Sequence, residues 1–114
     1  MALLEVELQR TIDLLEQLSP GEWTAATDCP DWDVRQMYLH VLGACQGSAS
    51  IREGIHQMRA ATKRRRASAG PLEANLSAVQ VAERAAIDPA QLVCDLRSIA
   101  PKTVKARKRI PGPL

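Results

Sequence analysis

Aromatic residues are scarce in this sequence. Its 114 residues include two Trp, one Tyr and no Phe, so the core must be built from aliphatic side chains. Leu, Ile, Val, Ala and Met favour packed helices over a sandwich of sheets. The length is close to the commonest size of a domain. We therefore expect one all-helical domain over residues 1–114.

Long hydrophobic runs and a targeting signal are also missing. No stretch approaches the roughly 18 consecutive apolar residues that a membrane helix needs. The start, MALLEVELQ, lacks the basic residues of a signal peptide. These absences predict a cytoplasmic protein without a membrane partner.

Cysteine is equally sparse. Cys29, Cys45 and Cys94 are an odd number at wide spacing, without a CxxC pair. This usage indicates reduced thiols and not a disulfide framework or a cysteine metal site. The sequence also contains no Gly-rich phosphate loop, no Ser/His/Asp signature and no pair of carboxylates spaced for catalysis, so no catalytic residue can be named.

The net charge of +2 conceals a division between the two halves of the chain. Residues 1–50 carry two basic and eight acidic side chains, whereas residues 51–114 carry thirteen and five. The basic excess lies in Lys63–Arg66 and between Lys102 and Arg109. Such clusters can meet phosphate or an acidic partner, although a solvated helix end or loop is the simpler explanation. Because no aromatic residues lie among them to stack on bases, we do not expect a nucleic-acid partner.

Apolar spacing predicts an up-down bundle of helices. The second helix has the clearest start, since Asp33 can cap it and Gln36 can return the hydrogen bond. Asp88, with Pro89 at the first helical position and Gln91 as return partner, predicts another helix start. Within the helix from Asp33 the spacing is kept by Val34, Met37, Val41, Ala44, Ser48, Ile51, Ile55 and Met58.

The expected helices cover residues 2–18, 33 to about 60, 72–86 and 88 onward. Pro101 should kink or break the last helix near Ala100, because its ring clashes with the carbonyl of Arg97. The basic segment at about 62–71 is expected to be a flexible loop, and the tail at about 110–114 to be non-helical.

His40 is the leading candidate for a functional residue. On its helix it borders the buried face, and Gly43 and Gly47 continue its line. Glycines inside a helix cost about 1 kcal/mol each, so their position indicates close approach by another group. His40 is either a metal ligand or a partly buried histidine bonded to a carbonyl oxygen. His56 is not its partner, because sixteen residues along a helix span about 24 Å.

The stretch LSPGEWTAATDCPDWDVRQMYLHVLGA carries a resemblance to a known family. Its Trp23, Cys29-Pro30, Trp32, Val34-Arg35 and His40-Val41 are similar to the N-terminal domain of mycothiol-dependent maleylpyruvate isomerases. That family is a branch of the DinB-like metal-binding helical bundles. The later QVAERAAIDPAQLVCDLRSIAPKTVKARKRIPG also looks like the family, so the resemblance covers nearly the whole chain.

The resemblance implies a function for His40. In the family the matching histidine is one of three protein ligands of a divalent metal, usually zinc, which activates the thiol mycothiol for isomerase or transferase chemistry. The two other ligands belong to a segment resembling Arg-Asp-x-Trp-x-His-Arg, which this sequence lacks. We therefore expect a DinB-like bundle without its last helix, inactive alone, with His40 as the metal ligand and the remaining ligands supplied by another chain or copy.

Two hypotheses about function remain open at this point. In the first, the domain is part of a metal- and mycothiol-dependent site, completed by a homo-oligomer or by a partner protein that supplies the missing helix. In the second, it is a non-catalytic helical interaction module with a basic surface.

Overall fold

The computed structural model describes residues 2–109, which form six α-helices and no β-strand. The helices are α1 (Ala2–Glu16), α2 (Pro20–Trp23), α3 (Val34–Ala49), α4 (Ile51–Ser68), α5 (Leu72–Glu83) and α6 (Pro89–Lys108). The prediction of an all-helical chain is confirmed. The tail predicted at 110–114 lies outside the described residues. None of the described helices combines the length and apolar character needed to cross a membrane.

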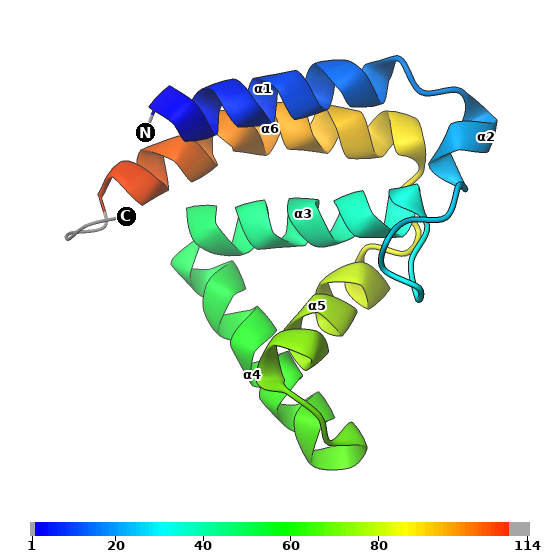
Figure 1. The fold of residues 1–114 in the computed structure, drawn as a ribbon. Coiled ribbons are helices and arrows are strands. Elements are labelled where there is room, and N and C mark those ends of the chain that lie inside the picture. The colour runs from blue at the N-terminus through cyan, green and yellow to red at the C-terminus, as the bar shows by residue number, and fades with distance from the viewer. Residues whose placement is uncertain (1, 110–114) are drawn as a thin grey trace.

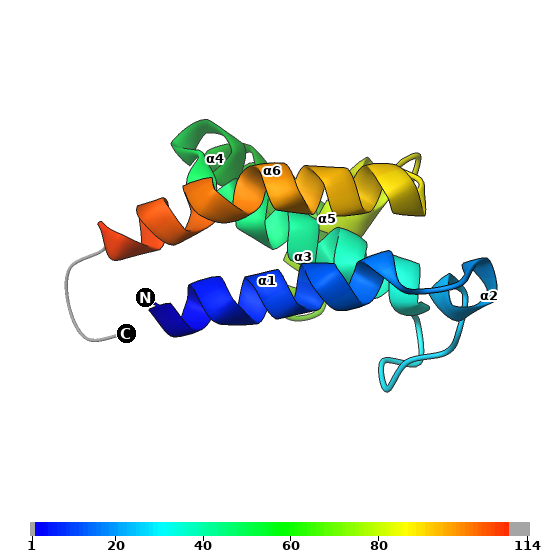
Figure 2. The ribbon, with the colours of Figure 1, turned by 90° about the horizontal axis from the view of Figure 1, so that it is seen from above.

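The helices form a three-helix layer with a hairpin attached to it. Helices α1 and α6 lie side by side and run in opposite directions, and α3 packs against α6 (Figures 1 and 2). Helices α4 and α5 pair with each other and extend away from this layer. The core lies between α1, α3 and α6 and is closed by Trp23 from α2. Its buried members are Ile12, Leu15, Trp23, Leu39, Leu42, Leu92 and Leu96.

The predicted caps are present at both helix starts. The Asp33 side chain accepts a hydrogen bond from the backbone N–H of Gln36, and Gln36 Oε1 accepts one from the backbone N–H of Asp33. Asp88 likewise accepts from the backbone of Gln91. The return partner predicted for Asp88 is wrong, because the Gln91 side chain donates to Asp95 instead.

The second predicted helix is two helices. Ser50 lies in an extended conformation between α3 and α4, and its hydroxyl accepts a hydrogen bond from the backbone of Glu53. A serine in this position is a favourable helix start, so the chain changes direction without a proline or a helix-breaking glycine. The change of direction also alters the core: Leu39 and Leu42 are fully buried, while the expected inward residues Ile51 and Ile55 are exposed.

The prediction of a basic loop at about 62–71 is wrong for most of its length. Helix α4 continues to Ser68, because lysine and arginine are good helix formers. The chain then turns at Ala69 and Gly70, whose φ angles are 58° and 88°. Arg64 donates to Asn75 Oδ1 at 2.6 Å, which fastens the end of α4 to α5.

The break predicted near Ala100 is absent, and α6 continues through Pro101. Both sides of the proline are anchored in the structure. Leu96 before it is 1% exposed, and Thr103 after it is buried. The Thr103 hydroxyl lies 3.0 Å from the carbonyl oxygen of Cys45 and 3.1 Å from that of Ile99. These contacts oppose a break that the proline alone would favour.

Smaller differences concern helix ends. The first helix ends at Glu16 and not at residue 18, and α5 ends at Glu83 and not at residue 86. Helix α2 was not expected. A reciprocal capping box between Ser19 and Glu22 forms it.

The close approach indicated by the helix glycines is confirmed. A Cβ atom on Gly43 would lie 2.7 Å from Gln80 Cβ, and one on Gly47 would lie 2.8 Å from Gln57 Oε1. Gly43 therefore meets the stem of its neighbour, whereas Gly47 meets a movable side-chain end. The absence of a side chain at Gly43 allows α5 to lie against α3.

We predict that Gly43→Ala destabilises the fold despite the higher helix propensity of alanine. Overpacking costs about 1–3 kcal/mol, against a gain of about 1 kcal/mol from propensity. Denaturant unfolding should show a net loss of up to about 2 kcal/mol. Gly21→Ala is the matched control, because no atom lies within 4 Å of its added Cβ. Equal stability of the two variants would contradict the close packing.

Candidate functional site

His40 lies on α3 at the point where this helix meets α5. The residue is half-buried. Its Nδ1 is 2.6 Å from Gln80 Oε1, and its ring stacks obliquely on Trp32 with the centroids 5.5 Å apart. The structure thus agrees with the alternative of a partly buried histidine bonded to a carbonyl oxygen. That oxygen belongs to the side-chain amide of Gln80.

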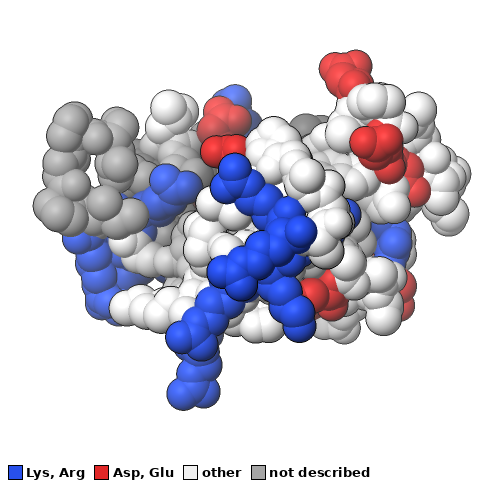
Figure 3. Space-filling model, turned by 90° about the horizontal axis from the view of Figure 1, so that it is seen from below, with Lys and Arg blue, Asp and Glu red and all other residues white. Residues whose placement is uncertain are grey.

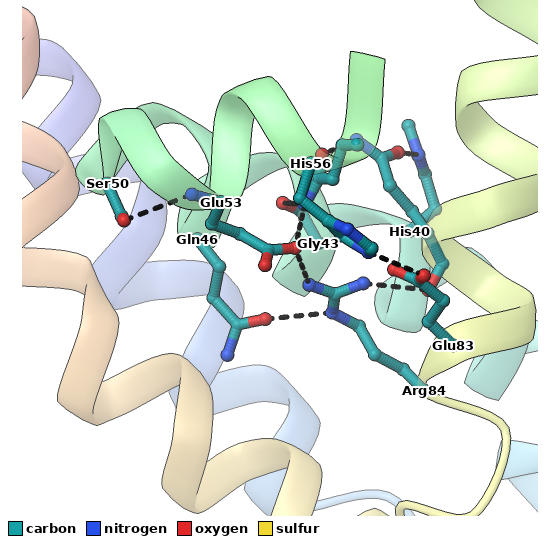
Figure 4. A network of polar contacts seen from close by, with 10 residues as sticks. His40, Gly43, Gln46, Ser50, Glu53, His56, Glu83 and Arg84 are labelled. Atoms are coloured by element: carbon teal, nitrogen blue, oxygen red, sulfur yellow. Dashed lines mark hydrogen bonds and ion pairs between the residues drawn. The ribbon is translucent and has the colours of Figure 1, made fainter. Parts of the chain in front are cut away.

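A relay of amide groups leads from His40 into the interface of the three helices α3, α4 and α5 (Figure 4). Gln80 Nε2 donates to Gln57 Oε1 at 3.0 Å. Gln57 Nε2 in turn donates to the carbonyl oxygen of Gly43 at 2.9 Å. Gln57 and Gln80 are each 3% exposed, so their hydrogen bonds must be satisfied within the protein.

The relay determines which nitrogen of His40 carries a proton. The carbonyl of Gly43 can only accept, so the NH₂ group of Gln57 must face it. Gln57 Oε1 then faces Gln80, whose own NH₂ group must point toward it. Gln80 Oε1 is left facing His40 and requires a donor, which places a hydrogen on Nδ1. In the neutral ring the lone pair is then on Nε2.

An ion pair lies beside this relay. Arg84 is 7% exposed, and its guanidinium donates to Glu53 Oε2 at 3.0 Å and to Gln46 Oε1 at 2.8 Å. Glu53 also accepts from Gln57 Nε2 at 2.8 Å, which connects the ion pair to the amides. Burial alone would raise the pKa of Glu53, yet the hydrogen bonds from Gln57 and Arg84 outweigh it and lower that pKa. Glu53 is thus held ionised, and its negative charge balances the buried positive charge of Arg84.

His56 lies on the surface of α4. Its side chain is 53% exposed, and Nε2 lies 2.7 Å from Glu83 Oε2. The hydrogen bond to Glu83 and the negative charge of that carboxylate raise the pKa of His56. It takes no part in the contacts that hold His40.

The described residues do not complete a metal centre. Nowhere between residues 2 and 109 do three His, Cys, Asp or Glu side chains come together in a way that could hold a metal ion. The assignment of His40 as a metal ligand therefore stays a prediction.

The three cysteines are free thiols in separate environments. Burial raises the pKa of Cys45, which makes its thiol a poor nucleophile at neutral pH. Cys94 is exposed on α6, and Cys29 is half-buried in the turn before α3. None of them lies within hydrogen-bond distance of His40 among the contacts formed by the described residues.

The motif around Cys29 to Arg35 has an evident structural role. The Thr27 hydroxyl accepts from the backbone of Cys29 and lies 2.8 Å from the carbonyl oxygen of Trp32, which closes the turn. Arg35 donates to the carbonyl oxygens of Ala85 and Ile87, in the connection between α5 and α6. The motif therefore sets the start of α3 and ties it to the end of α5, which fixes the position of His40 relative to Gln80.

No pattern in the sequence marks Gln57, Gln80 and Arg84 as members of the site. Gly43 and Gly47 indicated that something approaches His40, but not that glutamines do. Glu53, which no motif in the sequence marks, is the partner of a buried arginine.

We predict that the ion pair of His56 and Glu83 makes stability depend on pH. Because the pKa of His56 is raised in the folded state, its contribution is complete at low pH and is lost as the pH rises through that pKa. The unfolding free energy should fall slightly between about pH 6 and pH 8. In Glu83→Gln this fall should disappear, and NMR titration should show a lower pKa for His56. An unchanged pKa would contradict the ion pair.

Comparison with known proteins adds a family to this geometry. No curated protein and no solved structure matches the chain. The sequence profile described as the mycothiol maleylpyruvate isomerase N-terminal domain matches residues 4–111. This match spans nearly all of the chain and includes every residue of the relay. The chain belongs to the mycothiol maleylpyruvate isomerase N-terminal domain family.

Proposed function

We propose that the domain contributes His40 as one ligand of a divalent metal centre, with zinc as the first candidate, in a mycothiol-linked protein. The observation that carries the proposal is the contact of His40 Nδ1 with Gln80 Oε1 at 2.6 Å. In metal-binding histidines, the N–H of the second ring nitrogen commonly donates a hydrogen bond to an oxygen acceptor. This contact orients the ring and makes the ligating nitrogen more basic. Gln80 supplies such an acceptor and leaves the lone pair on Nε2.

The proposal places the remaining ligands outside the described residues. A single histidine does not make a zinc site, which normally has three or four protein ligands. A second copy of the chain or a partner protein would supply them. On this proposal the chain is inactive alone, and metal binding is accompanied by association.

We predict that zinc binding depends on His40 and not on His56. Wild-type protein, His40→Ala and the matched surface control His56→Ala are titrated with Zn²⁺ by calorimetry, and their mass is followed by light scattering. Wild type and His56→Ala should bind zinc and associate, whereas His40→Ala should do neither. Equal metal content in the three proteins would contradict the proposal, whereas no metal in any of them would exclude a second copy as the source of the remaining ligands.

A second variant tests the role of the amide. Gln80→Leu removes the acceptor of Nδ1 while keeping a side chain of similar length. Loss of such a supporting contact typically costs 10- to 100-fold in metal affinity, so we expect about a tenfold loss at least. Thermal unfolding by circular dichroism checks that the variant still folds.

A second candidate function is that of a helical interaction module. The observation that favours it is a row of large apolar side chains in solvent on α4. Ile51 is 84% exposed, Ile55 is 51% exposed and Met58 is 45% exposed. Calorimetry of metal binding distinguishes the two candidates, because the interaction module requires no metal.

A further inference from the structure

The outward face of α4 has the pattern of a coiled-coil seam. Ile51, Ile55, Met58 and Thr62 follow one another at steps of four, three and four residues. This is the spacing of the d and a positions in a heptad, a narrow apolar row that one partner helix covers. The side of the row away from the arginines lies against the rest of the fold, since Ala61 is buried and Gly54 meets the backbone of Gly47 on α3. Ile51, Ile55 and Met58 themselves are exposed.

Arginines accompany the row at exact heptad spacing. Arg52, Arg59 and Arg66 are seven residues apart and correspond to the e positions beside the seam. All three are exposed. The ion pairs among the described residues involve Arg84, Arg97 and His56 and none of these three. Figure 3, which views the molecule from below, shows a stripe of Lys and Arg side chains across the middle of the face, with carboxylates at its upper end and to one side.

Shallow hollows follow one another along the same row. The first is lined by Ile51, Arg52, Ile55, His56 and Arg59. The second is lined by Met58, Arg59, Thr62, Lys63 and Arg66. Each has apolar side chains at one edge and arginines at the other. A helix that places a large apolar residue in each hollow would bring its flanking residues next to the arginines.

We propose that the outward face of α4 binds an acidic amphipathic helix. The partner would carry apolar residues at its own a and d positions and carboxylates beside them, facing Arg52, Arg59 and Arg66. The inference rests on the second candidate function and names its surface and the chemistry of its partner. The row from Ile51 to Arg66 is about 22 Å long at roughly 1.5 Å per residue, so about three heptads would cover it.

The arginines argue against a second copy as the occupant of this face. If two copies met antiparallel through α4, their e positions would face each other, and Arg59 would lie opposite Arg59 of the other copy. Like charges at these positions are destabilising. In a parallel pair the e positions would meet the g side of the other copy, where Gly54 and the buried Ala61 offer no carboxylate. A bilayer surface is less suited, because the apolar row is narrow and lacks Trp and Phe.

The test uses the full chain and two synthetic 21-residue helices. Both have Ile at a and Leu at d. One has Glu at the e and g positions, and the control has Lys there. Fluorescence anisotropy should show binding of the Glu peptide with a dissociation constant of about 1–100 µM. The Lys peptide should bind at least about tenfold more weakly, because its charges repel the arginines.

Two variants locate the binding on α4. Ile55→Gln should weaken binding of the Glu peptide about tenfold through loss of apolar contact. Arg59→Glu should weaken it about three- to fivefold and should improve binding of the Lys peptide. Both positions are exposed, so the variants should fold and should keep the zinc response of the wild type. His40→Ala, in contrast, should keep peptide binding, which separates this inference from the proposal for the metal centre.

Several outcomes would overturn the inference. Equal affinity for the two peptides would show that the arginines do not discriminate between acidic and basic partners. If neither peptide bound at about 1 mM, this face of α4 would not be a docking surface. Self-association of the free chain that Ile55→Gln abolishes would assign the face to a second copy. Binding to phosphatidylglycerol vesicles that Ile55→Gln abolishes, without binding of the Glu peptide, would assign it to a membrane.

Discussion

The contact between Gln80 and the backbone of α3 at Gly43 is the constraint on which the other features depend. Because Gly43 has no side chain, the stem of Gln80 reaches the surface of α3. The amide can then contact His40 on one side and Gln57 on the other. Any side chain at residue 43 would separate α3 from α5, and the relay between the helices would lose its geometry.

The relay also explains how an arginine can be almost fully buried in this small domain. An isolated buried charge would cost several kcal/mol, but Arg84 has acceptors on both α3 and α4. Gln57 donates both to the backbone of α3 and to the carboxylate that balances Arg84. Neutral amides and the ion pair therefore form one connected network, in which each group fixes the orientation of the next.

Local chemistry made much of the fold predictable from the sequence. The caps at Asp33 and Asp88 depend on residues only three positions away, and the buried row of Leu92 and Leu96 depends on helical spacing. The break at Ser50 was missed, because a serine is also tolerated inside a helix. Only the tertiary contacts of α4 determine whether the helix continues or ends there. At Pro101 the local chemistry favours a break, but α6 continues, because tertiary contacts on both sides of the proline hold the helix together.

The site was predictable only in part. The glycines pointed to a close neighbour of His40, and a bond from His40 to an oxygen was one of the two alternatives considered. Which residue supplies the oxygen depends on how α5 lies against α3, across 40 residues of sequence. Nothing in the spacing of Gln57, Gln80 and Arg84 distinguishes them from polar residues on a solvated face, since their burial arises from the packing of separate helices.

The relay fixes the hydrogen of His40 on Nδ1. Long-range ¹H–¹⁵N NMR of the imidazole rings above pH 8 shows where this hydrogen lies, and His56 is the only other histidine in the chain. We expect opposite tautomers: Nδ1–H for His40, facing Gln80, and Nε2–H for His56, facing Glu83. Nε2–H at both histidines would contradict the relay and remove the basis for His40 as an oriented ligand.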